Sequence, residues 1–388
     1  MTIRNLIPVA LFLSASFSAF ACSSASEEEE LFEEDRCNQE GVSCQAYGRK
    51  NYENKPVAYE LGNGTRAPRL RLIHEGQPGW DPIDLEFNPR RPRELWIMNY
   101  ATSHMTIVRN AGTSQAQAIE RRDPAYSHYM YRPAGIAMAG EHPEWGQLWA
   151  TCGDNNSFGN YHMGPTLYSA ELDIFGGNNP QTGLGSHLDM LHSTSFCRGI
   201  AWAGTGNQYF VFNSYNKSID FYDFVQDHGP GNTDHSDGIV RRFWNNQVKG
   251  VNGVMSSVGW NPDDQKLYVA DTGNKRILAL DPSQGEPVAP FPGSEVIAER
   301  RYFEAPIAVV TSGGVLEEPS GIEASGGLAF VTDAKTSQIH AFDLATGERV
   351  RSLDTGLPTG SLAGLNFGPD GKIYFVDRKA SRVYRIDP

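Results

Sequence analysis

Several short motifs that mark common active sites are missing from this sequence. It contains no C-x-x-C, H-x-H or H-E-x-x-H spacing of the kind that fixes a metal site. It also has no G-x-S-x-G nucleophile elbow and no glycine-rich phosphate loop that joins a strand to a helix. No motif therefore points to a standard metalloprotease, serine hydrolase or nucleotide-binding enzyme.

Basic residues are also fewer than acidic ones. The 388 residues include 33 Lys and Arg against 46 Asp and Glu, so the formal net charge is −13. A negative surface repels phosphate backbones, and we expect no nucleic-acid partner. What the sequence does contain is 40 Gly together with 16 Tyr and 19 Phe. This composition is typical of short strands joined by tight turns around a large core.

A long apolar stretch occurs at the N-terminus, where residues 6–20 follow Arg4. It is too short for a stable membrane span, so residues 1–21 are expected to be an export signal. Cys22 follows a small-x-small cleavage site, which resembles a bacterial lipoprotein signal and predicts an acyl anchor on Cys22. The protein is then exported and held at the outer membrane or cell surface. The alternative is ordinary secretion, which gives a periplasmic or secreted protein.

Residues 22–67 are predicted to be an acidic tether with one small loop. Glu and Asp dominate residues 24–35, which cannot form a core. Beyond Cys22, an even number of cysteines suggests two disulfides in an oxidising compartment, with three possible connectivities. These cysteines are Cys37, Cys44, Cys152 and Cys197. Cys37 and Cys44 are near enough in the chain to pair, which leaves Cys152 with Cys197.

Near-copies of one hairpin pattern recur along residues 68–388. In KLYVADTGNKRILALD (266–281), an alternating run, an Asp-led turn and a second alternating run end in Asp. GGLAFVTDAKTSQIHAFD (326–343) and GKIYFVDRKASRVYRID (371–387) share this form, and looser copies occupy residues 93–110, 146–173 and 207–223. A short apolar element precedes each copy. Period-2 alternation of this kind predicts strands rather than helices.

Six copies with a repeat of about 40–65 residues predict an all-β protein, a six-bladed β-propeller over residues 68–388. The equivalent positions in the six pre-strands are Asp84, Gly135, Gly199, Ser257, Gly321 and Ala363. Runs such as 238–244 and 348–354 supply fourth strands, but none follows the last hairpin. Residues 68–76 have the missing pattern, so we expect this N-terminal strand to pair with the C-terminal blade and close the ring.

The later repeats resemble the NHL-repeat family of six-bladed propellers. SSVGWNPDDQKLYVADTGNKRILALD and PSGIEASGGLAFVTDAKTSQIHAFD carry the resemblance through their Gly-Ile, Tyr-Val-Ala-Asp and Asn-x-x-Ile patterns. The resemblance implies the fold, but propellers serve as scaffolds, receptors, lyases and hydrolases. In the related peptide-amidating lyase, histidines at the inner-strand positions bind zinc. Here those positions hold Gly, Ser, Ala and Asp84, so that ligand pattern is absent.

Histidines are expected to gather on one face of the propeller. Loops that lead into the inner strands and loops between second and third strands emerge together, on what we call the loop face. His128 and His192 each lie seven residues before an inner-strand glycine, and His162 lies in the long loop between them. Three imidazoles that converge there could bind zinc or copper. Surface histidines without a role are the alternative.

The other candidate ligand residues are an arginine, a tyrosine and several aspartates. Arg198 and Tyr161 lie near the histidines and could hold an anionic ligand. Asp84, the single acid at the inner-strand positions, could bind a cation or a polar ligand, or else cap backbone N–H groups. The loop at residues 227–238 is a possible calcium loop on the opposite face, with a solvated loop as the alternative. Its carboxylates are Asp227, Asp234 and Asp237.

Taken together, these features favour an exported, lipid-anchored binding module whose loop face holds a protein, peptide or glycan. The alternative is a metal-dependent lyase or hydrolase that uses His128, His162 and His192. Stoichiometric transition metal in the purified protein would favour the second hypothesis over the first.

Overall fold

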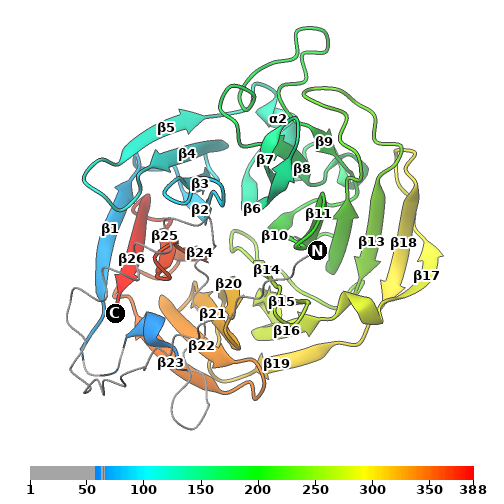
Figure 1. The fold of residues 1–388 in the computed structure, drawn as a ribbon. Coiled ribbons are helices and arrows are strands. Elements are labelled where there is room, and N and C mark those ends of the chain that lie inside the picture. Colours follow the sequence, from blue (N-terminus) through cyan, green and yellow to red (C-terminus); the bar gives the residue numbers. More distant parts are fainter. Residues whose placement is uncertain (1–56, 63, 65) are drawn as a thin grey trace, which may run out of the picture.

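The computed structural model describes residues 57–62, 64 and 66–388, and its regular secondary structure is almost entirely β-strand. Six sheets are arranged around a central axis, so the expected six-bladed β-propeller is confirmed (Figure 1). The predicted export signal, Cys22, Cys37 and Cys44 lie outside the described residues. Within residues 57–62, 64 and 66–388, no helix is long and apolar enough to cross a membrane.

Each blade contains four antiparallel strands. The inner strands are β2 (Pro82–Phe87), β6 (Pro133–His142), β10 (Cys197–Trp202), β14 (Val258–Asn261), β20 (Pro319–Ser325) and β24 (Leu362–Phe367). The second strands are β3 (Leu95–Asn99), β7 (Gly146–Gly153), β11 (Gln208–Asn213), β15 (Lys266–Asp271), β21 (Leu328–Asp333) and β25 (Ile373–Asp377). The third strands are β4 (His104–Arg109), β8 (Thr166–Ser169), β12 (Ser218–Asp223), β16 (Arg276–Leu280), β22 (Gln338–Asp343) and β26 (Arg382–Asp387). The outer strands are β5 (Gln117–Arg121), β9 (Asp189–Met190), β13 (Ile239–Phe243), β19 (Ala308–Ser312), β23 (Arg349–Asp354) and β1 (Arg69–Glu75).

The hairpin at residues 266–281 shows how the repeated sequence makes a blade. Leu267 and Val269 pack toward blade 3, whereas Tyr268 and Ala270 pack toward blade 5, so both faces of the strand are buried. The turn after β15 is held by the carboxylate of Asp271. This carboxylate accepts hydrogen bonds from Asn274 Nδ2 at 2.9 Å and Arg276 Nε at 2.7 Å. The Asp-led turn is therefore structural here, and Asp333 and Asp377 hold the corresponding turns of blades 5 and 6 by accepting from backbone N–H groups.

Small residues on the inner strands let neighbouring blades approach closely. A Cβ atom at Gly321 would lie 2.3 Å from the carbonyl oxygen of Ala363 in the next blade. At Gly364 it would lie 2.0 Å from Oδ1 of Asp84. Each inner strand packs against the next, and β24 packs against β2, so the ring of inner strands is complete. The repeated glycines thus fix the spacing of the blades.

The sixth blade combines the two ends of the described chain. β1 pairs with β26 in antiparallel register, from Arg69 opposite Asp387 to Glu75 opposite Arg382. Figure 1 shows β1, in blue, beside β26, in red. The segment expected at residues 68–76 is thus the outer strand of blade 6. Ala58 and Leu61 precede it and are buried against blades 5 and 6, so this part of the predicted tether packs on the propeller.

Blade 3 carries two additional strands from the chain of blade 4. The connection between β16 and β19 forms β17 (Glu286–Pro290) and β18 (Glu299–Glu304). β18 pairs in parallel with β13, and β17 extends the sheet further outward (Figure 1). The β17–β18 loop contacts loops within and after blade 2, because Ser294 bonds to Tyr161 and Glu295 bonds to His192.

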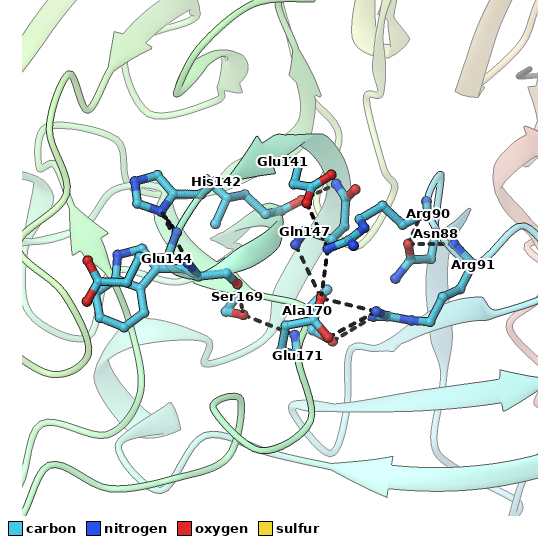
Figure 2. A network of polar contacts seen from close by, with 12 residues as sticks. Asn88, Arg90, Arg91, Glu141, His142, Glu144, Gln147, Ser169, Ala170 and Glu171 are labelled. Atoms are coloured by element: carbon cyan, nitrogen blue, oxygen red, sulfur yellow. Dashed lines mark hydrogen bonds and ion pairs between the residues drawn. The ribbon is translucent and has the colours of Figure 1, made fainter. Parts of the chain in front are cut away.

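Polar contacts tie blade 1 to blade 2 on the face opposite the loop face. Arg91, in the turn between β2 and β3, donates from Nη1 to Glu171 Oε2 at 3.0 Å (Figure 2). Its Nη2 donates to the carbonyl of Ala170 at 3.0 Å. Arg90 adds an ion pair of 3.0 Å to Glu141. These contacts hold turns of two neighbouring blades together.

Candidate ligand-binding and metal-binding sites

A loop lies across the central channel at the loop face. This loop connects β13 to β14, and its Met255 is 2% exposed and packs with core residues of blades 1, 2 and 6. Gly253 in the same loop accepts a hydrogen bond from Arg378 of blade 6 at 2.6 Å, and Asn252 accepts one from Arg198 of blade 3 at 3.1 Å. Contacts with four blades place the loop over the loop-face end of the channel.

The rest of the channel forms a cavity of about 270 Å³ lined by the inner strands. Burial falls toward the C-terminal ends of β2, β10 and β24, so the cavity opens on the face opposite the loop face. Three carboxylates and two indoles are among its lining residues: Asp84, Glu86, Glu323, Trp202 and Trp260. No Lys, Arg or His of the described chain lines this cavity. It is therefore an acidic, partly aromatic space.

Each carboxylate of the cavity is held by a neighbouring blade. Asp84 Oδ2 accepts from the backbone N–H of Ile136 at 3.0 Å, and Glu86 Oε2 accepts from the backbone N–H of Met138. Glu323 Oε1 accepts from Asn366 Nδ2 at 3.2 Å. The predicted capping role of Asp84 is thus present, and Asp84 is also one of the residues that line the cavity.

Burial and mutual repulsion raise the pKa values of these carboxylates. Burial raises the pKa of Asp84 to about 7. Burial and the nearby Asp84 carboxylate raise the pKa of Glu323 to about 8. Burial, with the charges of Glu323 and Asp84, raises the pKa of Glu86 well above its usual range. A positive charge in the cavity would relieve this repulsion.

The other two predicted ligand residues lie outside the cavity. Arg198 is 3% exposed, and its Nη1 pairs with Asp154, whose Oδ2 also accepts from Tyr100 OH at 3.0 Å. Its guanidinium group therefore already binds Asp154 and Asn252 within the protein. Tyr161 is 47% exposed on the surface. Of Asp84, Tyr161 and Arg198, the cavity contains Asp84 alone.

The three predicted metal-binding histidines lie near one another. The ring centroid of His192 is 6.4 Å from that of His128 and 5.9 Å from that of His162. Burial, with the charges of His192 and His162, lowers the pKa of His128 to about 4, so this imidazole is neutral at pH 7. Their nitrogen atoms nevertheless form no convergent group among the described residues.

Residues of the β17–β18 loop hold two of these histidines. His192 Nδ1 contacts Glu295 Oε2, and the backbone N–H of His192 donates to Glu295 Oε1 at 2.9 Å. Ser294 Oγ donates to the carbonyl of Tyr161 and lies 3.4 Å from His162 Nδ1. Sequence reasoning missed Glu295 because its segment is an insertion with no counterpart in the other repeats.

A different set of side chains converges next to these histidines. The potential ligand atoms of Asp189, His228 and His235 all lie within 4.8 Å of one another. Asp189 lies on β9, whereas His228 and His235 lie in the loop between β12 and β13. Burial raises the pKa of Asp189 to about 6 and lowers the pKa of His228. Burial opposes protonation of His235 too, but its bond to Asp189 raises the pKa of His235 overall.

The predicted calcium loop is arranged differently from the expectation. Asp227 accepts from Trp145 Nε1 at 2.7 Å, Asp237 accepts from the backbone of Gln226 at 3.1 Å, and Asp234 is exposed. These three carboxylates are not among the convergent groups of the described chain. The loop is expected on the face opposite the histidines, yet the ring of its His235 lies 5.9 Å from that of His192.

The Cys152–Cys197 disulfide is present and joins blade 2 to blade 3. Cys152 lies on β7 before the loop of His162, and Cys197 begins β10 after the loop of His192. The bond therefore fixes the two loops relative to each other, as the sequence predicted.

Comparisons with known proteins support the fold. No known family model and no curated protein sequence matches this chain, so the NHL resemblance stays a prediction. An auxiliary nutrient binding protein from Bacteroides thetaiotaomicron matches with 10% identity, 88% of this chain and 75% of that chain covered, and a TM-score of 0.52. Streptogramin B lyase matches with 11% identity, 82% and 97% coverage, and a TM-score of 0.50. Regucalcin, a calcium-binding protein from Agrobacterium tumefaciens, matches with 12% identity, 82% and 93% coverage, and a TM-score of 0.50. At such low identities these similarities establish a shared fold alone.

Proposed function

We propose that this protein is an exported binding module that holds an ammonium-bearing ligand in its central cavity. The observation that carries the proposal is the lining of that cavity: three carboxylates and two indoles, with no basic residue. Carboxylates attract an ammonium group, and indole faces stabilise it through cation–π contacts. The ligand is a small molecule or an exposed terminal group, such as an amino sugar or the amine of a peptide.

The spacing of the carboxylates favours an organic cation over a metal ion. Asp84, Glu86 and Glu323 are not among the convergent groups of the described chain, so they do not form a compact metal cage. A cavity of about 270 Å³ has space for a ligand about the size of one sugar ring or one side chain. Calcium binding by regucalcin nevertheless makes calcium the rival occupant to be tested.

Export is part of the proposal. The Cys152–Cys197 disulfide supports it, because such bonds persist in oxidising compartments. The N-terminal export signal and Cys22 supply the expected route and the lipid anchor. The structurally similar protein from Bacteroides thetaiotaomicron is named an auxiliary nutrient binding protein, which agrees with a binding role.

Matched ligand pairs test the proposal. Glucosamine is compared with glucose, and a lysine-containing dipeptide with both termini blocked is compared with its norleucine counterpart, by thermal shift and calorimetry on the full chain. We expect binding by the charged member of at least one pair and none by its neutral partner. The pair that responds distinguishes an amino-sugar ligand from a peptide amine. Calcium binding without any amine binding overturns the proposal.

Variants then locate the ligand. Glu323→Gln keeps the shape of the side chain and should weaken amine binding at least about 10-fold. Glu348→Gln is the matched control, because Glu348 lies in the same blade on the exposed β22–β23 turn. Equal affinities of both variants and the wild type would place the ligand outside the cavity and contradict the proposal.

A further inference from the structure

We propose that Asp189, His228 and His235 bind a zinc ion that ties the β12–β13 loop to the last strand of blade 2. This site is separate from the central cavity and does not depend on the ligand proposed there. Its residues also differ from the predicted set of His128, His162 and His192.

The three side chains already have nearly the spacing that zinc requires. Their potential ligand atoms lie within 4.8 Å of one another. Nitrogen and oxygen ligands of tetrahedral zinc, each about 2.0–2.2 Å from the metal, lie about 3.3 Å apart. Small side-chain rotations would close this difference.

The hydrogen bonds of His228 point its free nitrogen toward the site. His228 Nδ1 lies 2.7 Å from the carbonyl oxygen of Gly229, which can only accept, so Nδ1 carries the proton. Nε2 is therefore left with a lone pair, and it is buried without a hydrogen-bond partner. Imidazole ligands of metals commonly donate their second nitrogen in this manner.

Asp189 contributes a second unsatisfied acceptor. The side chain is fully buried, and its Oδ1 accepts from the backbone of Met190 at 2.6 Å and from His235 Nδ1 at 2.8 Å. Its Oδ2 is buried and has no partner. A buried carboxylate oxygen and an imidazole lone pair at one place cannot satisfy each other, because both are acceptors. A bound cation satisfies both.

The backbone holds the loop in position for this role. The backbone N–H of His228 donates to the carbonyl of Leu188 at 3.1 Å, next to Asp189. The backbone N–H of Gly231 donates to the carbonyl of His187 at 2.7 Å. The site is therefore organised before the metal binds, which reduces the ordering cost of binding.

The donor set selects zinc over calcium. Two imidazoles and one carboxylate suit zinc, whereas calcium prefers a cage of oxygen ligands. Three protein ligands leave a fourth position for water or another ligand, as in catalytic zinc sites. A loaded site of this kind is what the alternative hypothesis of a lyase or hydrolase would require.

Zinc titration of the full chain, purified without a histidine tag and treated with chelator, tests the proposal. We expect one zinc per chain with a dissociation constant below about 1 µM, seen by calorimetry and mass spectrometry. Asp189→Asn, His228→Ala and His235→Ala should each weaken binding about 100-fold or more. His128→Ala and His162→Ala are the controls and should bind as the wild type does.

Two results would overturn the proposal. One is the absence of zinc binding by the folded wild type. The other is zinc binding that His128→Ala or His162→Ala abolishes while His228→Ala and His235→Ala retain it. X-ray absorption at the zinc edge of the wild type keeps the test valid if a variant fails to fold. Scattering from two imidazoles supports the site, and a shell without imidazole contradicts it.

Discussion

Arg378 donates a hydrogen bond from Nη1 to the carbonyl oxygen of Gly253 at 2.6 Å. Arg378 follows β25 of blade 6, whereas Gly253 belongs to the loop that leads into blade 4. The same loop inserts Met255 into the core shared by blades 1, 2 and 6. The loop-face end of the channel is therefore covered, and the central cavity opens on the opposite face.

The loop that covers the channel should contribute to stability through Met255. Met255→Ala removes a side chain that is 2% exposed and should destabilise the protein by about 2–4 kcal/mol. Urea unfolding measures this loss. Val296→Ala is the control, because Val296 is 87% exposed and should change stability by less than about 0.5 kcal/mol. Similar losses for both variants would show that Met255 is not a buried anchor.

Stability should fall as pH rises, because of the cavity carboxylates. The pKa of Glu323 is raised from an ordinary 4.5 to about 8, so between these values the folded state holds a proton that the unfolded chain releases. Glu323→Gln removes this dependence. Relative to the wild type, its Tm should gain about 2–4 °C more at about pH 8 than at about pH 5. If the Tm of the two proteins changes with pH in the same way, Glu323 is ionised in the folded state and its pKa is not raised there.

Gly321, on the inner strand β20, should be intolerant of even one methyl group. A Cβ at residue 321 would meet the Ala363 carbonyl at 2.3 Å, so Gly321→Ala must shift a blade and should cost roughly 2–4 kcal/mol. Gly140→Ala is a matched control on β6, since its Cβ would make an ordinary contact of 3.6 Å with Trp202. Denaturant unfolding measures the free energy of unfolding of both variants. Equal values would contradict the close packing of Gly321 against Ala363.

The disulfide between blades 2 and 3 should stabilise the fold substantially. It joins residues separated by 45 positions, and closing a loop of this length is worth about 4 kcal/mol in the chain-entropy model. The Cys152→Ser/Cys197→Ser double variant should lose a comparable amount in urea unfolding. A loss below about 1 kcal/mol would mean that the two blades hold this geometry without the bond.

The fold could be predicted from the sequence because its signals are local. The hairpin at residues 266–281 contains its own alternation and its own Asp271 turn, and the repeats share them. The inner-strand position of Asp84 follows from counting repeats, and this placed it at the cavity. The Cys152–Cys197 pair followed from cysteine spacing.

The sites depend on contacts that no local pattern encodes. Nothing in residues 286–304 shows that they join blade 3, where their loop brings Glu295 to His192. The loop with His228 and His235 was assigned to the opposite face by strand topology, yet it runs along β9 and reaches Asp189. Glu86 and Glu323 appeared as ordinary strand residues, since only the closed ring gathers them with Asp84.

Calorimetry on the central cavity tests the proposed ligand binding most directly. The ammonium probe with the largest thermal shift is titrated into wild type and Glu323→Gln at about pH 6 and about pH 8, in two buffers with different ionisation enthalpies. A cation lowers the raised pKa values of Asp84 and Glu323, so binding should release protons and tighten as pH rises between these values. Loss of that proton release in Glu323→Gln is the expected result. Binding that is independent of pH and identical in both proteins would contradict a carboxylate-lined ligand site in the channel.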